Sequence, residues 1–255
     1  MKKYLPLKTG GTATIDILKD GDLADVMALH DEARAAMLAD GEGTLQPQGE
    51  AYFRNLLSRV TGLMVGARDT GKMVAQMAVI GPMTLREAIA LHVITRNDIA
   101  YHHASMDDNV IVFKSLAVHP IWRDNELEKH LIAFASWLPA SQVVDHIFSQ
   151  TSVSASRSWE AFVRQKFGIV AAAKDPQDGQ PRFILQKPSF GFDFEPHIIA
   201  DDVDPVSDFS GIVSLTQREG LVGLYENNAA LKLSFMRNRE EVSLMPVMAR
   251  VGKQR

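Results

Sequence analysis

Apolar residues along the chain switch repeatedly between the alternating spacing of strands and the longer spacing of helices. Residues 12–18 alternate, and an apolar series at helical spacing runs from Val26 to about Leu38. The strongest strand signal lies at 110–118, and the nearly continuous apolar run at 110–113 predicts burial on both faces. The pattern therefore predicts strands and helices that follow one another within one α/β unit.

The same spacing divides the first 187 residues into a series of elements. The predicted strands are 12–18, 63–67, 73–80, 110–118, 143–149 and 182–185, with a helix-to-strand turn at 167–170. Of the predicted helices, the first ends at about Leu38 and the other three cover 51–60, 127–138 and 158–166. Gly81 and Pro82 should end the strand before them, and 83–108 reads as a variable insertion with one short helix.

The composition changes near Lys187, so we expect one domain at 1–187 and a C-terminal extension at 188–255. Strand candidates in the extension are 211–215, 221–225 and 229–235. The extension is too short and too poor in apolar residues for an independent domain. Its aromatic and aliphatic residues should not stay in water, so it should pack against the main unit or against a second subunit of a homodimer.

Composition and charge narrow the function classes. Hydrophobic residues make up 46% of the chain, charged residues 23%, and the net charge is −4, as in an ordinary globular protein that binds neither nucleic acid nor membrane. No apolar run approaches the roughly 20 residues that span a bilayer. The chain has no cysteine, which excludes disulfides, thiolate nucleophiles and cysteine-bound metal. A cytoplasmic location is expected.

The most informative run is Leu-Ala-Val-His-Pro-Ile-Trp-Arg-Asp-Asn-Glu-Leu-Glu at 116–128, a buried strand, a proline-bearing turn and the start of an amphipathic helix. This run resembles the acyl-CoA-binding segment of the GCN5-related N-acetyltransferases, where strand, V-x-P turn, R-x-x-G-x-G loop and helix occur in that order. The resemblance covers about 12–187, including Phe167-Gly168, and the runs at 45–53 and 181–185 resemble a bacterial branch of that superfamily. It implies an α/β fold with a mixed, mostly antiparallel sheet flanked by helices and a C-terminal extension.

The resemblance also implies a function and a site. Acetyl-CoA or another acyl-CoA would be the substrate, and the acyl group would pass to an amine of a small molecule or peptide. The backbone of the strand would pair with the pantetheine arm and aim an N–H at the thioester carbonyl. The implied cofactor-binding residues are Leu116, Ala117, Val118, Arg123, Asp124, Asn125, Glu126, Leu127 and Glu128.

The sequence departs from the family pattern at four positions. Glu126 and Glu128 stand where the loop has its two glycines, and their carboxylates would repel a diphosphate. Alternatively, both are first-turn acids that complement a helix dipole on a solvated surface. The cofactor-contacting Asn of the family aligns with Ala155, and its proton-donating Tyr aligns with Arg164. An active acyltransferase and a degenerate binding or regulatory module both remain open.

Candidates for the chemical step come from the remaining polar residues. His146 is the predicted base that deprotonates the amine. The alternatives are His119, acting directly, and Gln150, acting through a water. Arg164 cannot donate a proton readily but can stabilise a thiolate. His102 and His103 with Asp107 and Asp108 match no standard ligand spacing, so we expect a solvated loop there and no metal.

Overall fold

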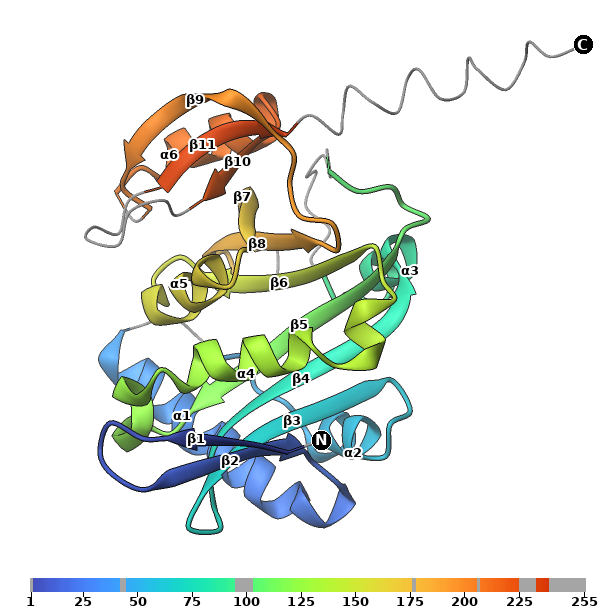
Figure 1. Ribbon diagram of the computed structural model, residues 1–255, viewed down its shortest axis with the longest axis vertical. Coiled ribbons are helices and arrows are strands. Elements are labelled where there is room, and N and C mark those ends of the chain that lie inside the picture. Colours follow the sequence, from blue (N-terminus) through green and yellow to red (C-terminus); the bar gives the residue numbers. More distant parts are fainter. Residues whose placement is uncertain are drawn as a thin grey trace, which may run out of the picture.

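The computed structural model describes residues 2–41, 45–94, 103–175, 178–205, 207–224 and 233–238, and these form one mixed sheet with helices on its faces (Figure 1). The strands are β1 Lys2–Pro6, β2 Thr12–Ile17, β3 Gly62–Asp69, β4 Lys72–Thr84, β5 Asn109–Val118, β6 His146–Ser152, β7 Gly168–Lys174, β8 Pro181–Pro188, β9 Phe194–Val203, β10 Leu221–Leu224 and β11 Leu233–Asn238. The α-helices are α1 Leu23–Asp40, α2 Glu50–Leu57, α3 Leu85–Ala90, α4 Leu127–Ser136, α5 Ser156–Arg164 and α6 Phe209–Val213. Shorter helical turns are η1 Asp20–Asp22, η2 Pro120–Asn125, η3 Pro139–Gln142 and η4 Ser214–Arg218.

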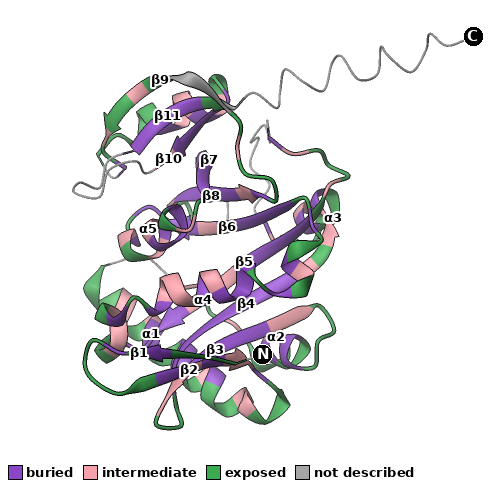
Figure 2. Cartoon of the chain, in the orientation of Figure 1, coloured by how far each residue is buried: buried purple, intermediate pink, exposed green. Residues whose placement is uncertain are grey.

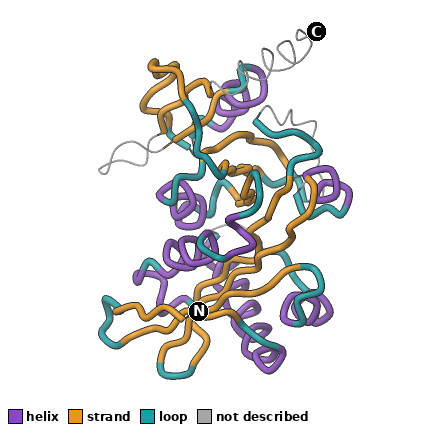
Figure 3. The backbone as a smooth tube through the Cα atoms, turned by 45° about the vertical axis from the view of Figure 1, so that its right-hand side comes forward, coloured by secondary structure: helices purple, strands orange, loops and turns teal. Residues whose placement is uncertain are grey.

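Helices lie on both faces of the sheet, which forms the middle layer in Figure 3. Side chains that alternate along β3 explain this arrangement. Val65 packs in the core cluster that contains Leu131 of α4, whereas Met64 packs in the cluster that contains Phe53 of α2 and Leu29 of α1. Helix α4 therefore buries its apolar stripe against one face of these strands, and α1 and α2 bury theirs against the other face.

The strand order is β1-β2-β3-β4-β5-β6-β8-β7-β10-β11-β9, and β5 with β6 is the parallel pair among antiparallel neighbours. That parallel register runs from Val110 opposite His146 to Phe113 opposite Ser149. Beyond it β5 stays hydrogen-bonded to β4 and β6 stays hydrogen-bonded to β8, so the two central strands separate.

A bulge in β5 lies where this separation begins. Lys114 pairs with Ala78 of β4 and Ala117 pairs with Gln76, so β5 contains one residue more than its partner over this stretch. Ser115 within the bulge has a φ of 52°, in the left-handed region. The bulge turns the side chains of neighbouring residues away from strict alternation.

Most predicted elements are confirmed, and the predicted end of the second hairpin strand is wrong. β4 continues through Gly81 and Pro82 to Thr84. Its register slips between the pair Ile80 and Val112 and the pair Met83 and Val110, so Pro82 occupies a bulge. A bulge residue donates no ladder hydrogen bond, which is why proline is tolerated inside this strand. The short helix expected within 83–108 is α3.

The extension after Pro188 packs against the main unit. β10 adds to β7 through Gly223 opposite Ile169, and Phe235 belongs to the same core cluster as Ile169. A Cβ at Gly168 would lie 2.2 Å from Val222, so glycine is required for this close approach. Figure 2 shows β10 and β11 as largely buried.

One prediction for the extension is wrong and two strands were not predicted. Residues 211–215 are helical, within α6 and η4, because Ile212 and Thr216 point inward at a spacing of four and Thr216 Oγ1 donates to the Ile212 carbonyl at 2.8 Å. β1 and β9 had no sequence prediction. Tyr225 and 229–232, the ends of two strand candidates, lie outside the described residues, and in the rest no helix is long and apolar enough to cross a membrane.

Candidate functional site

Two hollows lie beside the separating strands β5 and β6. The larger, called the large cavity below, has a volume of about 1180 Å³ and includes Lys114, Ser115 and Gln150 in its lining. The smaller, called the narrow slot, has a volume of about 50 Å³ and includes Leu116 and Val118. The two share no lining residue, so β5 separates two different environments.

The sheet supplies the charged part of the large cavity. Arg182 of β8 places its Nε 2.8 Å from Asp175 Oδ2, with both side chains less than a tenth exposed, and Arg182 also pairs with Asp178. Gln150 Nε2 of β6 donates to Asp175 Oδ2 at 3.3 Å. This network ties the ends of β6, β7 and β8 together at the cavity wall.

Lys114 is a partly buried lysine of the same wall. Burial lowers the pKa of its ammonium and the positive charge of Arg182 lowers it further, while the carboxylate of Asp175 opposes both. The Lys114 side chain lines the cavity, on the opposite face of β5 from its neighbour Phe113 in the core. A lysine amine that loses its proton more readily than usual therefore lines the cavity.

Tyr52 of α2 reaches the bulge across the cavity. Its hydroxyl lies 3.1 Å from Ser115 Oγ, and burial raises the pKa of the phenol. The phenol therefore keeps its proton throughout the neutral range and can donate it in a hydrogen bond. The cavity thus presents a hydroxyl pair, an amine, an amide and a carboxylate.

The narrow slot is lined by residues of α1, β5, α4 and α5. Burial raises the pKa of Glu128 to about 7, although the cations Arg157 and Arg123 act in the opposite direction. Arg123 Nη1 lies 2.6 Å from Asp40 Oδ2 at the end of α1. The arginine expected to bind phosphate therefore has an acidic partner already, and a partly buried acid, Glu128, lines the same slot.

Glu126 differs from Glu128 in every respect that matters for an anion. It has a φ of 55°, in the left-handed region that suits the family's glycine, and its side chain is 51% exposed. It pairs with Lys8 at 3.5 Å and Lys129 at 3.8 Å, and Lys129 is the main cause of its lowered pKa. Of the two glutamates, Glu128 is the one that lines the slot.

The structure brings together only part of the predicted cofactor-binding set. Leu116, Val118, Arg123 and Glu128 line the narrow slot. The other five lie elsewhere: Ala117 and Leu127 in the core, Asn125 buried with Nδ2 on the Trp122 carbonyl, and Asp124 and Glu126 exposed. The predicted backbone contacts of Ala117 stay a prediction.

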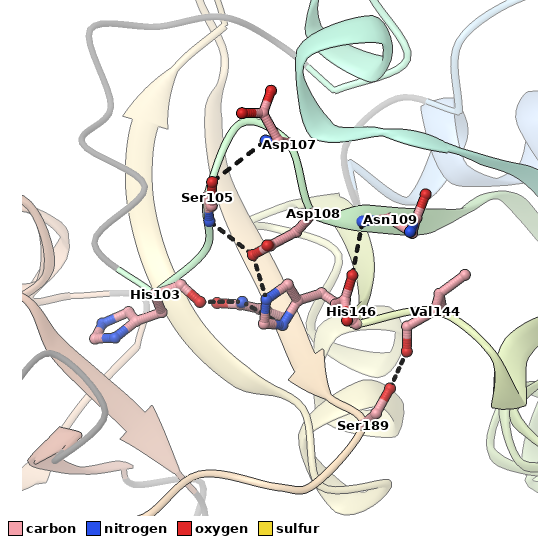
Figure 4. Close-up of polar contacts among 10 residues, drawn as sticks. His103, Ser105, Asp107, Asp108, Asn109, Val144, His146 and Ser189 are labelled. Carbon is pink, nitrogen blue, oxygen red and sulfur yellow. Dashed lines mark hydrogen bonds and ion pairs between the residues drawn. The ribbon is translucent and has the colours of Figure 1, made fainter. Parts of the chain in front are cut away.

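His146 lies at the opposite end of the parallel strand pair from the cavity. Its ring lies between Asp108 and the amide of Gln186, with Nε2 3.0 Å from Asp108 Oδ2 and Nδ1 3.1 Å from Gln186 Nε2. Figure 4 shows the His146 ring beside Asp108. Gln186 also donates to the His103 carbonyl at 2.9 Å, and Asp108 accepts from the Ser105 amide. These contacts fasten the turn before β5 to β6 and β8, and a catalytic role for His146 stays a prediction.

The other chemical candidates also lie outside the large cavity, except Gln150. Arg164 is partly exposed, with Glu160 at 3.9 Å. His119 Nε2 lies 3.2 Å from Glu32, and burial followed by the charge of Lys72 lowers its pKa. His102 lies outside the described residues, and in the described part of the chain no group of three His, Asp or Glu side chains can hold a metal ion.

Sequence reasoning missed Lys114, Tyr52, Asp175 and Arg182. One signal was available for Lys114, because it interrupts the apolar strand at 110–118. A lysine in a strand expected to be buried on both faces needs a reason. Nothing in the local sequence marks the other three, which meet only through the sheet.

Comparisons with known proteins place the fold. No family model matches the sequence, and no curated protein matches it. A GNAT-family acetyltransferase structure from Listeria monocytogenes is similar at a TM-score of 0.54 and 13% identity, over 73% of this chain and 99% of that one. One from Streptococcus agalactiae is similar at 0.53 and 15%, over 72% and 98%, and Arabidopsis thaliana NAA60 with acetyl-CoA at 0.51 and 11%, over 70% and 99%. The chain therefore has the fold of the GCN5-related N-acetyltransferases, as the sequence predicted.

Proposed function

We propose that the protein transfers an acyl group from acyl-CoA to an amine bound in the large cavity. The observation that carries the proposal is the separation of β5 from β6, with the cavity on one side and the Leu116–Val118 slot beside it. Backbone groups of separating strands are free to pair with an extended ligand arm. The similar fold of acetyltransferases supports this arrangement.

In the proposed reaction the amine attacks the thioester carbonyl, a C–N bond forms and the C–S bond breaks. The thiolate of CoA leaves, and the surplus proton of the amine passes to solvent or to the thiolate. A backbone N–H of the Leu116–Val118 strand stabilises the charge that develops on the carbonyl oxygen. Asp175 is the carboxylate among the described lining residues and positions the amine by accepting its hydrogen bond.

A thiol-release assay tests the proposal. Because the chain contains no cysteine, a thiol reagent added to enzyme, acetyl-CoA and a mixture of amines reports only the CoA that is released. Asp175→Asn should lose most of the activity, and His146→Gln tests the sequence-based alternative. No release above the uncatalysed rate with any amine or acyl-CoA would contradict the proposal.

A second function, a binding module without acyl transfer, is favoured by the narrow slot. A space of about 50 Å³ holds no more than a few waters, and the partly buried Glu128 together with the Arg123–Asp40 pair opposes a diphosphate. Calorimetric titration with acetyl-CoA separates the two functions. Binding by the parent protein supports the transferase, and binding only after Glu128→Gly supports the module.

A further inference from the structure

The wall of the large cavity has an excess of positive charge. Among its described lining residues, Arg59, Lys114 and Arg182 carry cationic groups and Asp175 carries the anionic one. Arg182 is neutralised by two carboxylates, Asp175 and Asp178. Lys114 has neither an ion pair nor a hydrogen bond with another residue that the structure describes, and Asp175 acts on it only through longer-range attraction.

A lysine in this position is costly unless a ligand compensates for its burial. An ammonium removed from water needs an anion close by, or it loses its proton. Packing does not require it, because a leucine or methionine would fill the same position on β5 without that cost. The lysine faces a cavity rather than the core, so a bound anion can reach it.

The rest of the lining indicates what else the ligand contains. Residues of the turns and strand ends around the cavity are mainly apolar: Leu45, Val60, Leu63, Ile80, Met83 and Val93. The volume of about 1180 Å³ exceeds that of many small-molecule sites, which hold about 300–1,000 Å³. There is room for an apolar body in addition to the charged groups.

We propose that the acceptor is a small molecule that carries a carboxylate and an amine on an apolar body, and that Lys114 binds the carboxylate. This inference rests on the proposed function and names its substrate class. The carboxylate on Lys114 and the amine beside Asp175 orient the acceptor between the two charged side chains of the sheet. The apolar body lies against the aliphatic lining.

Direct binding tests the inference without acyl-CoA. The probes are phenylalanine, 3-phenylpropanoate, phenylalaninamide and phenethylamine, each titrated calorimetrically into the full chain. A hydrogen bond to a charged group contributes about 1.5–3 kcal/mol. Phenylalanine should therefore bind about tenfold to a hundredfold more tightly than phenylalaninamide, and 3-phenylpropanoate should exceed phenethylamine by a similar factor. A tripeptide that ends in phenylalanine shows whether a peptide terminus or a free small molecule is preferred.

Variants connect the preference to the side chain. Lys114→Gln should abolish the advantage of the carboxylates, and Lys114→Arg should keep it. Lys187→Gln is the matched control, because Lys187 is half-buried with a pKa lowered by burial but does not line the cavity.

Equal affinity for phenylalanine and phenylalaninamide, or no binding of any probe at millimolar concentration, would overturn the inference. Both results are measured on the parent protein, so they hold even if every variant fails to fold. Failure of the proposed function gives a different result, because thiol release is then absent while the preference for carboxylates persists.

Discussion

The large cavity and the narrow slot lie beside the same strand but differ in what burial does to their charged groups. In the cavity, burial favours loss of the Lys114 proton, and the neighbouring Arg182 is matched by carboxylates. In the slot, burial raises the pKa of Glu128 to about 7. Glu128 stands at a glycine position of the acetyltransferase loop that the sequence resembles. The cavity is thus an open site with an unmatched cation, and the slot is a nearly filled one with a partly buried acid.

The fold therefore sets the positions of the strands, whereas the side chains that line the cavity and those that line the slot can differ independently. The backbone of β5 is common to both, whereas their side chains come from different helices and loops. One side can be suited to a ligand while the other is closed to one. Variants on each side should therefore have separate effects, from the largest to the smallest as follows.

Arg182→Leu should give the largest effect, because it leaves Asp175 buried without its main partner. Removing one member of a buried ion pair typically costs about 3–5 kcal/mol in the free energy of unfolding. Urea denaturation at pH 7 measures the loss. The control Arg164→Leu removes a partly exposed pair and should cost less than about 1 kcal/mol. Equal losses in the two variants would mean that the cavity wall is not held by this ion pair.

Glu128→Gln should stabilise the protein at pH 8. The folded-state pKa of about 7 lies above the ordinary value of 4.5, so folding disfavours the ionised carboxylate. That destabilisation is absent below about pH 4.5, grows as the pH rises through 7 and then stays constant, with an upper limit of about 3 kcal/mol. Denaturation curves of parent and variant across this range should converge at the acidic end.

Glu126→Gln is the control for Glu128, since its side chain is exposed and its pKa is lowered by Lys129. It should change stability by no more than about 0.5 kcal/mol, in the destabilising direction at pH 8. Stabilisation by both variants would show that repulsion along the whole loop, rather than burial of Glu128, is the cause.

Glu126→Gly should be more stable than Glu126→Ala by about 1 kcal/mol. The backbone at this residue is left-handed, a conformation that costs an L-residue about 1–2 kcal/mol and glycine almost nothing. Thermal unfolding of the two variants measures the difference.

The combined Glu126→Gly and Glu128→Gly protein should also bind acetyl-CoA more tightly than the parent. Weaker binding would contradict the role assigned to the slot.

Tyr52→Phe should have a small effect, a loss of about 0.5–1.5 kcal/mol, because one hydrogen bond to Ser115 disappears while the ring stays packed. Ser115→Ala should cost a similar amount, and the double variant should cost less than the sum. Strict additivity in this cycle would show that the two hydroxyls do not interact across the cavity.

Much of the fold was predictable because the relevant signals are local. The apolar run at 110–113 indicated β5, and the apolar stripe from Leu127 indicated α4. Pro82 misled the prediction because local rules treat proline as an end, whereas a bulge opposite β5 accommodates it. Residues 211–215 were assigned as a strand because two buried positions four apart are too few to distinguish the periods.

The candidate site was only partly predictable. The sequence placed Glu126 and Glu128 at the glycine positions of the motif that it resembles, and it placed Leu116 and Val118 on a strand. Only the tertiary structure decided that Glu126 is exposed while Glu128 lines the slot, and that Lys114 lines the same cavity as Asp175 and Arg182. Backbone periodicity depends on neighbours in sequence, whereas burial, charge pairing and cavity shape depend on residues brought together from distant strands.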